Sequence, residues 1–250
     1  MQAASGRHDR RVVGPLLAAV AIAFVLQGLV GRASGATTRI ARGFELYSTS
    51  CASCHGPQAA GTLQGPSLRG VGPAAIDFML STGRMPIADP SATPVRMEPR
   101  FSSADIEAII AYVTSLQAGG PAIPSVDVAA GKLELGNQLF QGNCAACHGA
   151  AAQGGSVGGG EVAPGLNQAT ATQIAEALRI GPGVMPRFGT EQITAEDANS
   201  LARYVLYLRT HGNEGGLDLG RVGPVAEGFV AWVVGLGILI LVIRLTGTKT

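Results

Sequence analysis

All four cysteines of this 250-residue chain lie in two motifs of the same form, each followed directly by a histidine. The motifs are Cys51-Ala-Ser-Cys54-His55 and Cys144-Ala-Ala-Cys147-His148. Cys-x-x-Cys-His is the attachment signature of c-type haem, in which two thiols add to the porphyrin vinyl groups and the histidine presents a ring nitrogen to the iron. The sequence therefore predicts two covalently bound haem c groups, with the histidine of each motif as an axial iron ligand.

Other uses of paired cysteines agree less well with this pattern. Zinc sites built from two Cys-x-x-Cys pairs space the pairs by about 15–20 residues, whereas 89 residues lie between Cys54 and Cys144. A thioredoxin-like redox pair needs no histidine after its second cysteine. Structural disulfides stay open as an alternative at this stage.

Each half of the chain also contains one Gly-x-Met-Pro segment, which supplies a candidate for the second axial ligand. The segments are Gly83-Arg84-Met85-Pro86 and Gly183-Val184-Met185-Pro186. A methionine thioether opposite a histidine raises the potential of an electron-transfer haem. Because the second half has no other methionine, elimination predicts Met185 as the ligand of the second iron.

The first half offers three methionines after its haem motif. Met79 corresponds to Arg179 in the repeat and is predicted to pack in the core from a helical stretch. Met97 has no counterpart in the second half and is predicted to lie in a surface insertion. We therefore predict Met85 as the second ligand of the first iron.

Two prolines are candidates for orienting the histidines. Pro66 follows the first motif histidine by 11 residues, and Pro164 follows the second by 16. A ligating histidine usually donates its other ring N–H to an acceptor, and a proline carbonyl would serve; ordinary turn prolines are the alternative. Arg84, beside Met85, also has two interpretations: it pairs with a haem propionate, or it is simply exposed.

Helical segments precede and close each haem motif, so the chain reads as an internal repeat. Ser102 and Thr194 each begin a closing helix and are followed three residues later by an aspartate, a variant of the capping box. Apolar residues then recur with helical spacing. The sequence predicts a mostly α protein with two tandem class I cytochrome c domains, at 40–118 and 132–212, joined by a linker at 119–131.

Composition points to a membrane and away from nucleic acid. Charged residues make up 14% of the chain, apolar residues 46%, and the net charge is +1. A nucleic-acid binder would carry a basic footprint that this chain lacks. The glycine-rich run 154–160 lacks the Gly-Lys-Ser/Thr of a phosphate-binding loop and is predicted to be a flexible loop.

Apolar segments lie near both ends of the chain. Residues 12–31 form 20 uncharged residues after an arginine-containing tail, 1–11, which we expect in the cytoplasm. This length crosses a hydrocarbon layer of about 30 Å and exceeds the roughly 7–15 residues of a signal core, which favours a retained anchor. A cleaved secretory signal is the alternative, because small residues follow at 33–36. Residues 222–245, with Trp232 near one end, predict a C-terminal transmembrane helix.

With these features in place, the chain resembles the dihaem cytochrome c (cytochrome cc) subunit of the cytochrome bcc menaquinol–cytochrome c reductase typical of actinobacteria. The matching segments are Gly65-Pro-Ser-Leu-Arg-Gly-Val-Gly72, Ser81-Thr-Gly-Arg-Met85-Pro, Gly181-Pro-Gly-Val-Met185-Pro-Arg-Phe188 and Gly223-Pro-Val-Ala-Glu227-Gly ahead of Trp232. The resemblance extends from about Ile40 to the C-terminus.

The resemblance implies a place in a respiratory complex with cytochrome b and Rieske iron–sulfur subunits and an aa3-type cytochrome c oxidase. It implies that the isolated chain is an electron carrier and that enzyme activity belongs to the proton-translocating complex. Because c-type haem is normally attached outside the cytoplasmic membrane, we expect a multi-pass protein with both haem domains on the outer face.

Two other functions share some of these features. A membrane-bound dihaem carrier for another reductase or dehydrogenase would have the same haem motifs. A dihaem peroxidase would need one iron with an open coordination position, which a Gly-x-Met-Pro segment in each half disfavours.

Overall fold

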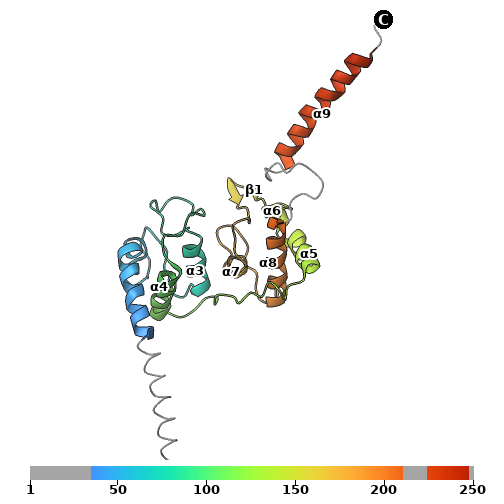
Figure 1. The fold of residues 1–250 in the computed structure, drawn as a ribbon. Coiled ribbons are helices and arrows are strands. Elements are labelled where there is room, and N and C mark those ends of the chain that lie inside the picture. The colour runs from blue at the N-terminus through green and yellow to red at the C-terminus, as the bar shows by residue number, and fades with distance from the viewer. Residues whose placement is uncertain (1–34, 211–223, 248–250) are drawn as a thin grey trace, which may run out of the picture. The chain divides into compact units, whose positions relative to one another are not determined.

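The computed structural model describes residues 35–210 and 224–247, and the chain divides into two compact units, Met1–Ala122 and Ile123–Thr250. The predicted tail 1–11 and the apolar segment 12–31 lie outside the described residues. Helices make up most of the described structure (Figure 1), which confirms the mostly α fold expected from the sequence.

The first unit contains a first helix followed by three labelled ones. They are a helix described over residues 35–50, α2 (Ala52–His55), α3 (Pro73–Ser81) and α4 (Ser103–Leu116). The first helix approaches α4 so closely at Gly43 that any side chain there would overlap the carbonyl group of Ala108. One turn further on, the rings of Tyr47 and Tyr112 lie 5.3 Å apart between their centroids. A glycine crossing followed by an aromatic contact therefore joins these two helices.

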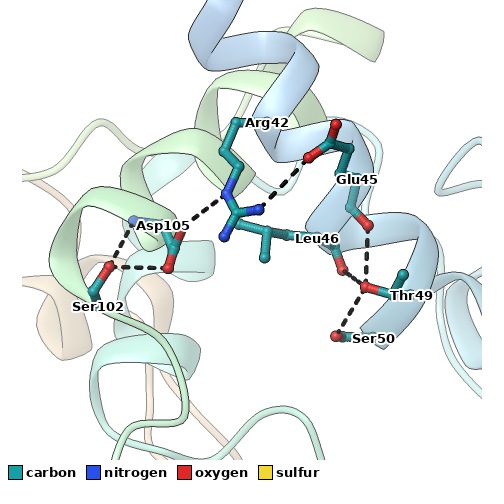
Figure 2. A network of polar contacts seen from close by, with 7 residues as sticks. All are labelled: Arg42, Glu45, Leu46, Thr49, Ser50, Ser102 and Asp105. Atoms are coloured by element: carbon teal, nitrogen blue, oxygen red, sulfur yellow. Dashed lines mark hydrogen bonds and ion pairs between the residues drawn. The ribbon is translucent and has the colours of Figure 1, made fainter.

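A polar network on the surface also joins the first helix to the beginning of α4 (Figure 2). The Ser102 hydroxyl accepts a hydrogen bond from the Asp105 N–H at 3.2 Å, which is the expected helix cap. Asp105 accepts from Arg42 Nε at 3.0 Å, and Arg42 also pairs with Glu45 at 3.5 Å. Since Arg42 and Glu45 are more than half exposed, their ion pair contributes about 0.2–1 kcal/mol.

The second unit repeats this arrangement with a small sheet added. Its elements are α5 (Leu133–Asn143), α6 (Ala145–His148), β1 (Gly155–Gly158), β2 (Glu161–Ala163), α7 (Ala171–Ile180) and α8 (Ala195–Thr210). Figure 1 shows α5 beside α8. Gly136 meets the Ser200 carbonyl where these helices cross, and the rings of Phe140 and Tyr204 are 5.6 Å apart. Thr194 caps α8 through the Asp197 N–H at 3.1 Å.

The glycine-rich run in the second unit is a β-hairpin, which differs from the flexible loop that the sequence predicts. Strands β1 and β2 pair antiparallel, with an irregularity in register between Ser156 and Gly158. Three successive glycines, 158–160, have φ values of 92°, 61° and 85° and form the turn. Only glycine adopts such angles without strain, so the run that suggests flexibility in the sequence instead makes a tight reversal.

Residues 119–121, within the predicted linker, belong to the surface of the first unit. The Ala74 N–H donates to the Pro121 carbonyl at 3.1 Å. Gly72, with φ of 88°, lies so close to Gly120 and Pro121 that a Cβ there would come within 2.7 Å of their backbone. The division between the compact units falls immediately afterwards, at Ala122.

Helix α9 (Pro224–Thr246) is the C-terminal apolar helix that the sequence predicts. Its stretch Gly228–Thr246 is the one helix, among the residues the structure describes, that is long and apolar enough to cross a membrane. None of this stretch is buried against the rest of the protein. Its apolar surface therefore has no protein partner within the described chain, which agrees with a membrane environment.

Candidate haem sites

Each Cys-x-x-Cys-His motif forms one short helical turn at the end of the helix before it. In the first unit the N–H groups of Cys54 and His55 both donate to the Cys51 carbonyl, at 3.2 and 2.9 Å. In the second unit Cys147 and His148 donate to the Cys144 carbonyl at 3.1 and 2.9 Å. The same backbone turn thus places two thiols and an imidazole in each unit.

All four cysteines lie in the described part of the chain, and none of them is paired in a disulfide there. Among the described residues, no three His, Cys, Asp or Glu side chains gather in a metal-binding cluster. Burial, followed by the charge of the partner cysteine, raises the pKa of Cys51 and of Cys144 to about 11.

Both motif histidines are nearly buried, each with 9% of its surface exposed. His55 Nδ1 lies 2.8 Å from the carbonyl oxygen of Pro66, and His148 Nδ1 lies 2.9 Å from that of Pro164. A carbonyl can only accept, so Nδ1 carries the proton and Nε2 keeps its lone pair. This is the tautomer that a histidine needs to bind a metal through Nε2.

The loop that holds each proline carbonyl is anchored by the same two backbone hydrogen bonds in both units. In the first unit the Gly61 N–H donates to the His55 carbonyl at 2.8 Å, and the Leu68 N–H donates to Ala59 at 2.9 Å. The equivalent bonds in the second unit are Gly154 to His148 at 2.7 Å and Leu166 to Ala152 at 2.9 Å. The hairpin is inserted between these anchors, which explains how spacings of 11 and 16 residues give the same contact.

The two Gly-x-Met-Pro methionines pack against the same cores as the haem motifs. Met85 contacts the buried cluster of the first unit, which Cys51 and Leu68 also contact. Met185 contacts the cluster of the second unit, as do residues of the second motif and its loop, namely Cys144, Ala145 and Leu166. The structure therefore brings the predicted thioether and the predicted haem motif of each unit to one core.

The other methionines of the first unit are placed differently. Met79 lies in a helix, α3, as predicted, but it is half-buried and does not belong to the buried cluster of the first unit, so the predicted core packing is wrong. Met97 is 63% exposed, although its N–H donates to the Thr82 carbonyl at 3.1 Å. The segment carrying Met97 thus lies against the turn before Met85 by its backbone, with its thioether in solvent.

A hydrogen bond from Tyr47 to the residue after His55 could not be predicted from the Cys-x-x-Cys-His motif. Tyr47, which is fully buried, donates its hydroxyl proton to the carbonyl oxygen of Gly56 at 2.7 Å, directly after His55. In the second unit Phe140 stands at the equivalent place in the repeat. In the sequence, this hydrogen bond is indicated only by the difference between tyrosine and phenylalanine at equivalent positions of the repeat.

Comparison with known proteins agrees with this geometry. Residues 40–117 match the family model described as Cytochrome c, and residues 131–205 match the one described as Cytochrome C oxidase, cbb3-type, subunit III. Two relatives named cytochrome bc1 complex cytochrome c subunit, from Mycobacterium leprae (strain TN) and Mycobacterium tuberculosis (strain ATCC 25618 / H37Rv), are each 39% identical over 203 residues. These matches cover 78% of this chain and 70% and 72% of the relatives.

A relative of the same name from Corynebacterium diphtheriae is 34% identical over 231 residues, covering 84% of this chain and 81% of the relative. The chain belongs to the family of cytochrome bc1 complex cytochrome c subunits. The predicted family is thereby confirmed. As a cytochrome c subunit with two cytochrome c domains, the chain is an electron carrier that binds two covalently attached haem c groups, as the sequence predicts.

Among solved structures, a reducing HAO-like protein complex of Kuenenia stuttgartiensis matches with a TM-score of 0.37 and 16% identity. The match covers 67% of this chain and 95% of that chain. Similarity at this level carries no information about the function of the cytochrome c subunit.

Proposed function

We propose that this chain passes electrons from a Rieske iron–sulfur protein, reduced beside a cytochrome b subunit, to an aa3-type terminal oxidase. Its relatives are named as cytochrome c subunits of the bc1 complex, which supports a place beside quinol-oxidising subunits. The observation in this chain that carries the proposal is the presence of two complete and separate donor sets, one in each unit. When bound, each haem c supplies one-electron chemistry.

The proposed donors are the same four side chains in each unit. They are Cys51, Cys54, His55 and Met85 in the first unit, and Cys144, Cys147, His148 and Met185 in the second. The cysteines would hold the porphyrin through two thioether bonds, and the histidine and the methionine would both bind the iron. An iron held by both side chains would transfer electrons without binding oxygen or peroxide.

The surroundings of these donors restrict their movement. The carbonyl groups of Pro66 and Pro164 hold the imidazole rings in one orientation and one tautomer. Each ring is nearly buried, so little of the ligand is open to water. A rigid and dry ligand set suits electron transfer, because ligand positions then change little between the two oxidation states.

Attachment to the membrane follows from the two apolar segments. We propose that α9 and the segment 12–31 both cross the cell membrane and that both haem units lie on its outer face. Anchoring would keep the carrier beside its donor and acceptor, so that no freely diffusing cytochrome c is needed between them.

The rival functions differ in what they require of the site. A dihaem peroxidase needs one iron that binds its substrate directly, whereas each unit here places a methionine against the core of its own haem motif. A carrier for a different reductase needs the same ligands, so only its partners distinguish it.

The deciding experiment is purification of the tagged full-length chain from membranes in mild detergent. We expect cytochrome b, Rieske and aa3 oxidase subunits to copurify, and a menaquinol analogue to support oxygen consumption by the preparation. Recovery of the dihaem chain with a different quinol or substrate dehydrogenase would overturn the proposed partners.

The ligand set is tested on the same preparation by carbon monoxide binding to the reduced protein. Wild type and Met97→Ala, which changes an exposed methionine, should bind carbon monoxide poorly. Met85→Ala and Met185→Ala should each open one iron and give one carbon monoxide complex, with both haems still attached. Ready binding by the wild type would favour the peroxidase, and no binding by either ligand variant would refute the methionine assignment.

A further inference from the structure

The side chain of Arg84, directly before the proposed ligand Met85, is a cation in a partly buried position. Its Nη1 atom is buried and has no hydrogen-bond partner among the described residues. The guanidinium lies over the ring of Phe78, with 4.9 Å between its central carbon and the ring centroid, and Phe78 is itself 5% exposed. The structure thus does not agree with the simply exposed arginine that the sequence leaves open.

The described part of the chain itself supplies no anion to the partly buried guanidinium of Arg84. No carboxylate within the described ranges forms an ion pair with Arg84, since those of the first unit belong to Arg39 and Arg42. A buried cation is costly unless a hydrogen-bonded anion accompanies it. The contacts of the chain itself therefore leave a donor that fits a carboxylate.

The second unit has no such cation at the equivalent place. Val184, which is 63% exposed, precedes Met185 where Arg84 precedes Met85. The arginine of α7, Arg179, donates to the backbone carbonyls of Phe188 and Gly189 at 3.2 and 3.1 Å, so its charge has a structural use. Among the residues that the structure describes, Nε of Arg209, in α8 of the second unit, is also buried without a partner, but Nη2 of that residue donates to the Leu166 carbonyl at 3.4 Å. A partnerless guanidinium directly before the proposed ligand methionine is found in the first unit, where the second unit has Val184.

We infer that Arg84 binds a propionate carboxylate of the haem held in the first unit. This inference rests on the proposed ligand set, because Met85 places that haem beside Arg84. Arginine suits the role, since its planar fork of N–H donors matches the two oxygens of a carboxylate. A fixed positive charge beside one haem favours its reduced state, which carries one positive charge fewer. The first haem is thereby given a higher potential than it would have with a valine at position 84.

The test compares Arg84→Gln with Arg69→Gln in the full-length protein. Arg69 is an exposed cation of the same unit whose guanidinium donates to Gln58, so the control removes the same charge from the surface. Resonance Raman spectroscopy of the haem propionate bending modes reports the contact directly, and a redox titration reports its effect. Both measurements are independent of turnover in the complex.

We expect Arg84→Gln to shift the propionate mode of one haem and leave the other unchanged. At a fixed ambient potential, the oxidised-to-reduced ratio of that haem should rise about tenfold, which corresponds to about 59 mV for a one-electron couple. Arg69→Gln should alter neither the propionate modes nor this ratio by more than about twofold. Should Arg84→Gln fail to accumulate, Arg84→Val, which installs the residue type of the second unit, carries the same expectation.

An unchanged propionate mode in the Arg84 variants would overturn the inference, and it would indicate an anion from solution. Equal shifts in potential for the Arg84 and Arg69 variants would overturn it too, because a distant field would then account for the effect. Failure of the ligand set is recognised separately: Met85→Ala would then leave the iron spectrum unchanged, whatever the Arg84 variants do.

Discussion

Removing the hydrogen bond from Tyr47 to Gly56 would measure how much this bond stabilises the segment that carries His55. The hydroxyl is fully buried, and its acceptor is the carbonyl of the residue after His55. The substitution Tyr47→Phe removes the donor and keeps the ring, which packs 5.3 Å from Tyr112. The second unit uses Phe140 at the equivalent place, so the fold accepts a phenylalanine there.

The free-energy cost of Tyr47→Phe depends on whether the Gly56 carbonyl keeps another hydrogen bond. A buried acceptor left without any partner costs about 1–3 kcal/mol. The Gly56 carbonyl still accepts from the Ala59 N–H at 3.1 Å after the substitution, so we expect the lower end, about 1 kcal/mol. For a unit of this size, about 1 kcal/mol lowers the melting temperature by about 4–8 °C.

Hydrogen exchange on the full-length holoprotein locates the effect. The Gly61 N–H, which donates to the His55 carbonyl, should exchange about fivefold faster in Tyr47→Phe, because about 1 kcal/mol changes an opening equilibrium by that factor. The equivalent Gly154 N–H of the second unit should not change. Tyr112→Phe is the matched control, since its hydroxyl donates to Pro57 over a longer 3.3 Å and should matter less. Equal exchange in wild type and Tyr47→Phe, or a larger effect from the control, would refute this reasoning.

Three further outcomes are expected. Burial raises the pKa of Tyr47 from 10.0 to about 12. The stability that the protonated hydroxyl contributes is therefore complete below pH 10 and declines between pH 10 and about 12. A pH series of denaturant titrations should show this decline in wild type and not in Tyr47→Phe. Gly136→Ala should lower the free energy of unfolding of the second unit by about 1–3 kcal/mol, because the added methyl group would overlap α8. Gly142→Ala, in the same helix but beside open space, should not lower it. Denaturant titration measures both. A chain ending after Thr210 should stay in the membrane fraction if 12–31 is retained as an anchor, and its release would favour a cleaved signal.

Much of the local structure could be predicted from the sequence, because each sequence pattern occurs in both halves of the repeat. Ser102 and Thr194 begin their helices as the capping pattern predicts. The approach of a proline carbonyl to each motif histidine is present in both units, despite unequal spacing. Such features depend on residues near in sequence, so one chain suffices to find them.

Features that depend on long-range packing could not be predicted. Glycines at 158–160 suggest a flexible loop, because their positive φ values become visible only in the hairpin. Residues 119–121 contact the first unit through a close approach of their backbone to Gly72. A contact between backbone atoms produces no pattern of apolar residues by which the sequence could predict it. Whether Arg84 is exposed or buried depends on the ring of Phe78, six residues earlier and in another element.

The differences between the two units indicate where each acquires its own properties. The two backbone bonds that anchor the histidine loop and the contact of Nδ1 with the proline carbonyl are the same in both units to within about 0.1 Å. The hairpin enters the second unit between two of these anchors and leaves them intact. Arg84 is likewise added beside the ligand loop of the first unit, where the second has Val184. Changes outside a shared ligand scaffold can therefore alter the surroundings of one haem without altering its ligands, as the proposed contact of Arg84 would do in the first unit.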